Sequence, residues 1–71
     1  MITRKIIGAK LRQHRKARKM TQYDLHTLTG RSQKAISLIE QGKANLYADE
    51  LLLIADALEI NVYDFGKWKS K

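Results

Sequence analysis

The chain has 71 residues and a formal net charge of +7, and it contains neither cysteine nor proline. This length allows a single domain, residues 1–71, with one modest core, and the lack of cysteine excludes disulfides and fits a reducing cytoplasm. Neither histidine, His14 or His26, has a thiolate or paired carboxylates beside it, so we expect no metal and no other cofactor. Because the sequence has no membrane-spanning apolar run and no signal peptide, we expect a cytoplasmic protein without membrane contact.

Apolar residues recur at helical rather than alternating spacing, which predicts a compact all-α domain of five helices. The first three helices follow residues that cap helix N-termini, namely Thr3, Thr21 and Ser32. The second and third end at Gly30 and Gly42, where a left-handed conformation can turn the chain. The fourth helix is predicted within residues 46–60 and a short fifth at 62–65, followed by a loosely ordered tail, 66–71.

Each of these helices has a side that is predicted to face the core. In the first helix Ile7, Leu11, His14 and Arg18 fall on one side, and the second helix carries Leu25 and Leu28 inward. The corresponding residues are Ala35, Ile36 and Ile39 in the third helix, and Leu51, Ile54, Ala55 and Leu58 in the fourth. Asp24, three residues after Thr21, adds a shortened form of a capping box to the second helix.

The charge is distributed unevenly along the chain. Residues 1–34 have a net charge of +9, with ten Lys and Arg residues and one acid, whereas residues 35–71 have a net charge of −2. A cationic half predicts a polyanionic partner that meets one face of the molecule. A soluble protein with a basic helix has the same composition, so charge alone leaves both interpretations open.

Segment 21–41 contains two short helices joined by a glycine turn, which is the arrangement of a helix-turn-helix. The outer side of its second helix, residues 33–41, carries Gln33, Lys34, Ser37 and Gln41, with Leu38 at the edge. Glutamine can pair with adenine and lysine with guanine, serine can donate or accept, and leucine can cover a thymine methyl. An ordinary amphipathic helix with a solvated polar face has the same pattern, so both interpretations stand at this point.

Three runs, IGAKLRQHRKARKMTQYDL, TGRSQKAISLIEQGK and LLLIADALEINVYDF, resemble the Cro/repressor-type (XRE) helix-turn-helix family. The similarity covers residues 7–65, and its most specific parts are Thr21-Gln22, Leu25, Gly30-Arg31-Ser32 and residues 36–42. The resemblance implies a five-helix domain that binds operator DNA as a homodimer. It also implies base-reading positions at Gln33, Lys34, Ser37 and Leu38. Phosphate contacts are expected from Gln22, Arg31, Gln41 and Lys43, although Arg31 also fits a solvated turn residue.

The resemblance further implies an ion pair between Arg15 and Glu40, which lie at the margins of the apolar sides of their helices. An uncompensated buried charge costs on the order of 3–5 kcal/mol, so we expect both residues to be structural. Three positions depart from the family pattern. His26 and Thr29 replace small apolar residues between the two helices, and Arg31 replaces a common valine in the turn.

Two further surfaces lie outside the helix-turn-helix. The first helix carries a basic stripe of Lys5, Arg12, Lys16 and Lys19, for which a solvated face is the simplest interpretation. Contact with the DNA backbone is an alternative, and a lipid surface is disfavoured because the opposite side is needed for the core and has no aromatic residue. The second surface is a predicted subunit interface formed by Leu53, Tyr63, Phe65 and Trp68.

A homodimer is expected because a chain this small often needs a partner subunit for stability. Two subunits related by a two-fold axis would place their recognition helices about 34 Å apart and require a palindromic operator. The sequence therefore predicts a sequence-specific transcriptional regulator of double-stranded DNA. The alternative is an antitoxin-like protein that neutralises a toxin partner and autoregulates through the same surface. An enzyme is not expected, because the sequence has no nucleophile–base set, no glycine-rich phosphate loop and no metal site.

Overall fold

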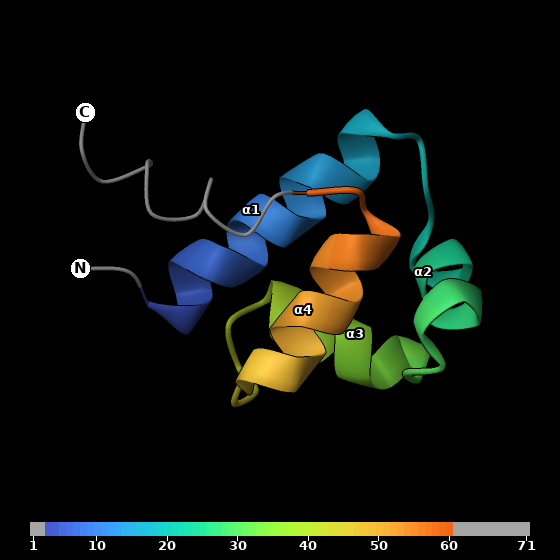
Figure 1. Ribbon diagram of the computed structural model, residues 1–71. Helices are drawn as coiled ribbons and strands as arrows, with labels where there is room; N and C mark the ends of the chain where they lie inside the picture. Colours follow the sequence, from blue (N-terminus) through green and yellow to red (C-terminus); the bar gives the residue numbers. More distant parts are fainter. Residues whose placement is uncertain (1–2, 61–71) are drawn as a thin grey trace.

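The computed structural model describes residues 3–60, which contain four α-helices and no strand (Figure 1). These are α1 (Arg4–Ala17), α2 (Gln22–Thr29), α3 (Gln33–Glu40) and α4 (Ala48–Ala57). The predicted all-α class is thus confirmed over these residues. The fifth helix predicted at 62–65 and the tail 66–71 lie outside the described part of the chain.

The predicted capping residues begin the first three helices. The hydroxyls of Thr3 and Ser32 each accept a hydrogen bond from a backbone N–H of the first turn. Thr21 and Asp24 form a complete capping box, because each side chain accepts from the backbone N–H of the other, at 3.0 Å and 2.9 Å. Gly30 follows α2 with a φ of 76°, the left-handed conformation that lets the chain turn toward α3.

The fourth helix is shorter than the predicted range of 46–60. It begins after Tyr47, which makes no side-chain capping bond, and Leu58 is its C-cap. Glu59 has a positive φ of 58°, and this left-handed residue turns the chain before the predicted end. The core-facing side is nevertheless as expected, because Ile54 and Leu58 are among the most deeply buried side chains.

One apolar core joins all four helices. Its buried members are Leu11, Leu25, Ile36, Ile39, Ile54, Ala55, Leu58 and Ile60. Leu28, which is predicted to face the core, lies outside it, and so does Arg18, which is predicted on the same side of the first helix as Leu11. Leu28 is 60% exposed, because the inward side of α2 is centred between Leu25 and Thr29 and leaves Leu28 at the outer margin. Arg18 is exposed at the C-cap of α1, where its guanidinium donates to the carbonyl of His14.

Helices α1 and α3 approach closely at Gly8, a residue for which the sequence suggested no specific role. A β-carbon added at Gly8 would lie 2.1 Å from the carbonyl oxygen of Ile39 and 3.0 Å from that of Glu40. Only a residue without a side chain therefore allows α1 to rest on the C-terminal end of α3. This contact sets the position of α1 beside the outer side of α3.

Among residues 3–60, no helix combines the length and the apolar character that a membrane span requires.

Candidate nucleic-acid interface

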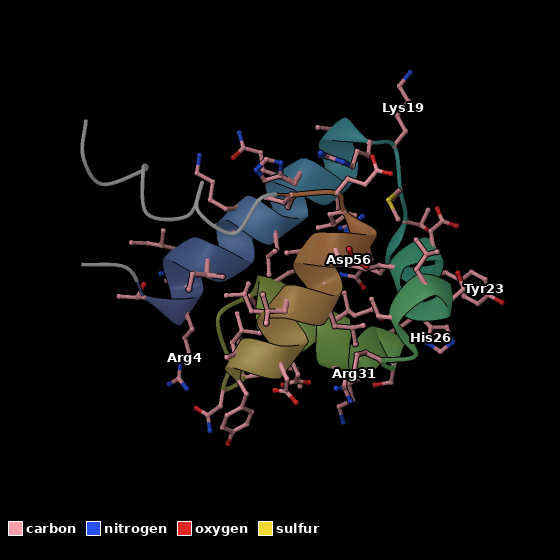
Figure 2. All side chains as sticks on the ribbon, in the orientation of Figure 1. Arg4, Lys19, Tyr23, His26, Arg31 and Asp56 are labelled. Atoms are coloured by element: carbon pink, nitrogen blue, oxygen red, sulfur yellow. The ribbon has the colours of Figure 1, made fainter. Side chains whose placement is uncertain are left out.

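The turn between α2 and α3 is held by the polar side chains of His26 and Thr29. His26 Nδ1 lies 2.6 Å from the carbonyl oxygen of Arg31 and donates to it, since a carbonyl only accepts. The hydroxyl of Thr29 donates to the carbonyl of Leu25 at 2.8 Å and accepts from the N–H of Arg31 at 3.2 Å. Figure 2 shows His26 and Arg31 at this end of the molecule. The side-chain hydrogen bonds of His26 and Thr29 thus stabilise the turn between α2 and α3.

Helix α3 has one buried side and one open side. Ile36 and Ile39 are buried in the core, whereas Gln33 and Lys34 are exposed at the N-terminal end of the helix. Within residues 3–60, neither of these two exposed side chains has a hydrogen-bond or ion-pair partner. Their amide and ammonium groups are therefore available to a ligand that meets this side of α3.

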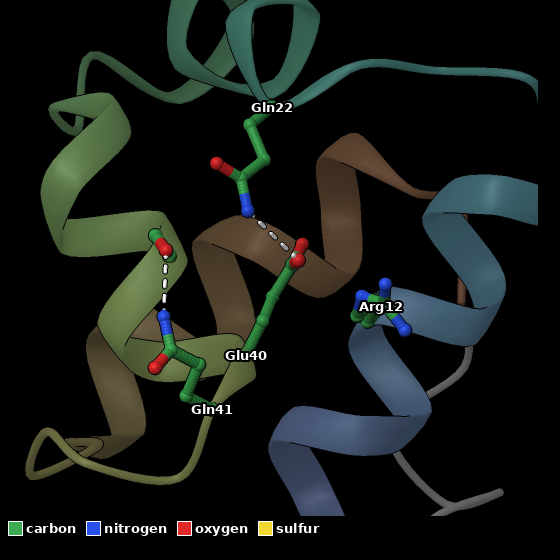
Figure 3. A pocket seen from close by; sticks show the side chains of 5 residues that line it. Arg12, Gln22, Glu40 and Gln41 are labelled. Carbon is green, nitrogen blue, oxygen red and sulfur yellow. Dashed lines mark hydrogen bonds between the residues drawn. The ribbon is translucent and has the colours of Figure 1, made fainter.

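The next turn of α3 carries the other predicted base-reading residues. Ser37 and Leu38 are partly buried, and Gln41 is exposed just after the helix. The Gln41 amide donates to the Ser37 hydroxyl oxygen at 2.9 Å, as drawn in Figure 3. Because Ser37 accepts from Gln41, the hydrogen of its own hydroxyl remains free to donate outward.

An ion pair ties α3 to α1 behind this surface. Arg15 Nε donates to Glu40 Oε2 at 2.7 Å, and its Nη2 donates to Oε1 at 3.0 Å. The exposed fractions of the two side chains are 8% and 3%, and the third guanidinium nitrogen donates to the carbonyl of Met20 at 2.7 Å. The pair is thus bidentate and buried, and it is the pair that the family resemblance implied.

Glu40 also forms a hydrogen bond with Gln22, one of the predicted phosphate-contacting residues. The Gln22 amide, at the first position of α2, donates to Glu40 Oε1 at 3.2 Å (Figure 3). This bond orients the amide so that its second N–H and its oxygen remain available. A buried carboxylate on α3 therefore positions a polar side chain at the start of α2.

An open pocket of about 430 Å³ lies where α1, α2 and α3 meet. Its lining residues are Arg12, Gln22, Ser37, Glu40 and Gln41 (Figure 3). Three of the predicted DNA contacts are thus brought together, and they are joined by Arg12, which the sequence placed in the basic stripe of the first helix. The sequence contained no signal for this placement, because it depends on how α1 packs on α3.

The two remaining predicted phosphate contacts have different surroundings. Arg31 Nε lies 3.5 Å from Glu50 Oε2 on α4, and the exposed fractions of the two side chains are 40% and 20%. Arg31 therefore links the turn to α4 and presents only part of its guanidinium outward. Lys43 is exposed beyond the end of α3, and no partner for its side chain occurs in the described part of the chain.

The predicted subunit interface is covered only in part by the described residues. Leu53 is 36% exposed on α4, and its neighbour Leu52 is more exposed, at 54%. The same outer side of α4 carries Asp56, which is labelled in Figure 2. Tyr63, Phe65 and Trp68 lie outside residues 3–60.

The fold and the turn define the class of this protein: two short helices, joined by a left-handed glycine and capped at both N-termini, form a helix-turn-helix. A family model described as the Cro/C1-type HTH DNA-binding domain matches residues 10–71. The chain therefore belongs to this family, also called the XRE family, as the motifs at residues 21–42 suggested. No curated protein matches the chain. Membership of this family makes residues 10–71 a DNA-binding domain.

Proposed function

We propose that this protein is a sequence-specific transcriptional regulator that binds duplex DNA with α3 in the major groove. The observation that carries the proposal is the open side of α3. Gln33 and Lys34 are exposed there and have no hydrogen-bond or ion-pair partner among residues 3–60, and they lie opposite the buried Ile36 and Ile39. An α-helix fits the width of the major groove, and unused donors and acceptors on its outer side can form hydrogen bonds with base edges there.

The base-reading roles follow from the chemistry of each side chain. The Gln33 amide can pair with adenine N6 and N7, and the Lys34 ammonium can donate to guanine O6 and N7. Ser37 accepts from Gln41, so its hydroxyl is best suited to donate to an acceptor such as thymine O4 or guanine N7. Leu38 supplies an apolar contact for a thymine methyl.

Phosphate contacts fix the register of the helix on the duplex without reading sequence. In this proposal Gln22 contacts the backbone through the N–H that Glu40 does not use. Gln41 and Lys43 contact it from the C-terminal end of α3, and Arg31 contacts it through the guanidinium nitrogens other than the Nε that lies beside Glu50.

The regulator is proposed to act as a homodimer. One recognition helix reads only a few base pairs, and two copies related by a two-fold axis would read a palindrome. The interface is proposed to include Leu53, together with Tyr63, Phe65 and Trp68 beyond the described residues. The exposed apolar surface at Leu52 and Leu53 supports a contact on this part of α4.

Selection of binding sites from a randomised duplex library tests the proposal. The wild-type protein should recover a palindrome whose half-sites are about one helical turn apart. Gln33→Ala and Lys34→Ala should each lose about 1–3 kcal/mol of discrimination at particular base pairs, because each removes one set of base-edge hydrogen bonds. Binding to the selected site and to single-base variants, measured by fluorescence anisotropy, gives this discrimination.

Gln22→Ala is the matched control, because it removes an amide that is proposed to contact phosphate only. It should weaken binding to all sequences alike. If Gln33→Ala and Lys34→Ala leave the preference unchanged, the proposed reading surface is wrong. An asymmetric selected site bound by a monomer would contradict the homodimer. A toxin that co-purifies with the chain would support the antitoxin-like alternative, which uses the same DNA surface.

A further inference from the structure

We propose that Arg12 on α1 and Gln22 on α2 bind one and the same phosphate of the DNA backbone, in the pocket that they share. The inference rests on the proposed function and adds to it a contact from outside the helix-turn-helix. The basic stripe on α1 had two interpretations, a solvated face and a contact with the DNA backbone. For Arg12 the inference selects the contact with the DNA backbone.

The first argument is that Arg12 is available. The chain has five arginines, at positions 4, 12, 15, 18 and 31. Four of them interact within the protein: Arg4 with Asn45, Arg15 with Glu40, Arg18 with His14, and Arg31 with Glu50. Arg12 is exposed, and no group within residues 3–60 accepts a hydrogen bond from its guanidinium. Its planar set of donors is therefore free for an external anion.

The second argument concerns the charge of the pocket. Glu40 lines it, and a free carboxylate there would repel a phosphate. However, both carboxylate oxygens of Glu40 accept hydrogen bonds from Arg15, and the exposed fraction of its side chain is only 3%. The pair is neutral as a unit, so Arg12 supplies the uncompensated charge of the pocket. An anion that enters therefore meets a net positive site.

The third argument is the position of the pocket relative to α3. Ser37 and Gln41 line it together with Arg12 and Gln22, so the pocket opens beside the proposed base-reading side of α3 (Figure 3). Gln22 keeps one N–H for a ligand after its bond to Glu40. An arginine fork and an amide N–H around one opening can bind the non-bridging oxygens of a phosphodiester. The close packing at Gly8 holds α1 near enough to α3 for this.

Salt dependence of binding to a short mixed-sequence duplex is the first test, and it needs no knowledge of the operator. Arg12→Gln should reduce the magnitude of the slope of log affinity against log salt by about 0.9, the value for one phosphate contact. Arg18→Gln removes the same charge from another side of α1 and should leave the slope close to that of the parent. Arg12→Lys should keep most of the slope, because the charge remains. Equal slopes for Arg12→Gln and Arg18→Gln would overturn the proposal.

The second test asks whether Arg12 and Gln22 meet the same phosphate. Single phosphates of the selected site are replaced by neutral methylphosphonates, and the loss of affinity is measured at each position. At one position, the methylphosphonate should weaken DNA binding by the wild-type protein but have little further effect on binding by Arg12→Gln or by Gln22→Ala. If the two variants become insensitive at different positions, or at none, the shared site does not exist. Thermal unfolding of Arg12→Gln should match the parent, because Arg12 is exposed. Gln22→Ala should unfold at a somewhat lower temperature than the parent, because it removes the hydrogen bond to Glu40.

The two tests separate this inference from the proposed function. If Gln33→Ala and Lys34→Ala lose discrimination while Arg12→Gln behaves like Arg18→Gln, only the inference fails. If Arg12→Gln changes the slope while Gln33→Ala and Lys34→Ala keep the parent's preference, the phosphate site stands and the base-reading assignment fails.

Discussion

Replacing Glu40 with alanine should lower the free energy of unfolding by about 3–5 kcal/mol, the usual effect of breaking a buried ion pair. Glu40 accepts two hydrogen bonds from Arg15 and one from Gln22, and both charged side chains are almost fully buried. Without the carboxylate, the Arg15 guanidinium stays buried, and the Met20 carbonyl is its one remaining partner among residues 3–60. Urea unfolding followed by circular dichroism measures the loss, which is large compared with the stability of a small domain.

Two further variants make this result specific. Asp56→Ala removes an exposed carboxylate from α4 and should change stability by less than about 0.5 kcal/mol. The double variant Arg15→Met with Glu40→Leu should be more stable than Glu40→Ala, because it leaves no unpaired buried charge. Where Glu40→Ala remains folded, it should keep the sequence preference and bind all duplexes more weakly, because Gln22 loses its partner. A Glu40→Ala protein as stable as the parent would contradict the structural role of the pair.

The second large effect is expected at Gly8. In an ordinary exposed helix position, replacing glycine with alanine stabilises by about 1 kcal/mol, because alanine has the higher helix propensity. At Gly8 the sign should be reversed, since the new methyl would lie 2.1 Å from the Ile39 carbonyl oxygen. The neighbouring atoms are backbone and cannot rotate away, so α1 must move from α3. We expect a loss of about 2–3 kcal/mol, in the upper range for overpacked cores.

Ala9→Gly is the matched control for this prediction. Ala9 is the exposed neighbour of Gly8 on α1, and glycine there should cost only the helix propensity, about 1 kcal/mol. The Gly8→Ala protein should also bind DNA more weakly, because Arg12 and Arg15 both depend on the placement of α1. A Gly8→Ala protein that is more stable than the parent would show that α1 and α3 are not in close contact there.

The parts of the fold that depend on local chemistry could be predicted from the sequence. The side-chain oxygens of three residues suffice to predict helix N-caps at Thr3, Thr21 and Ser32. Glycine adopts a left-handed conformation without steric cost, so the turn at Gly30 could also be predicted locally. The apolar character of Leu28 predicts a core position, but Leu28 is exposed, because in a helix as short as α2 the burial of a residue at the margin depends on the neighbouring helices.

The parts of the candidate site that depend on packing could not be predicted. Helical spacing placed Arg12 in a stripe with three lysines, and only the contact of α1 with α3 brings it into the pocket beside Gln22. Gly8 carries no sequence signal of its own, since its role exists only because a carbonyl of α3 lies opposite it. The ion pair of Arg15 with Glu40 was accessible only through the family resemblance, because the two residues are 25 positions apart.

Backbone amide chemical shifts of the wild-type protein, recorded during titration with the selected duplex, test the central claim that α3 is the DNA-reading surface. The largest changes should occur at Gln33, Lys34 and Ser37 on α3 and at Gln22 at the start of α2. Residues on the outer side of α4, such as Leu52 and Asp56, should change little when the titration is carried out at a fixed protein concentration. If the largest changes lie on α4 while the amides of residues 33–38 stay in place, the protein does not bind DNA through α3.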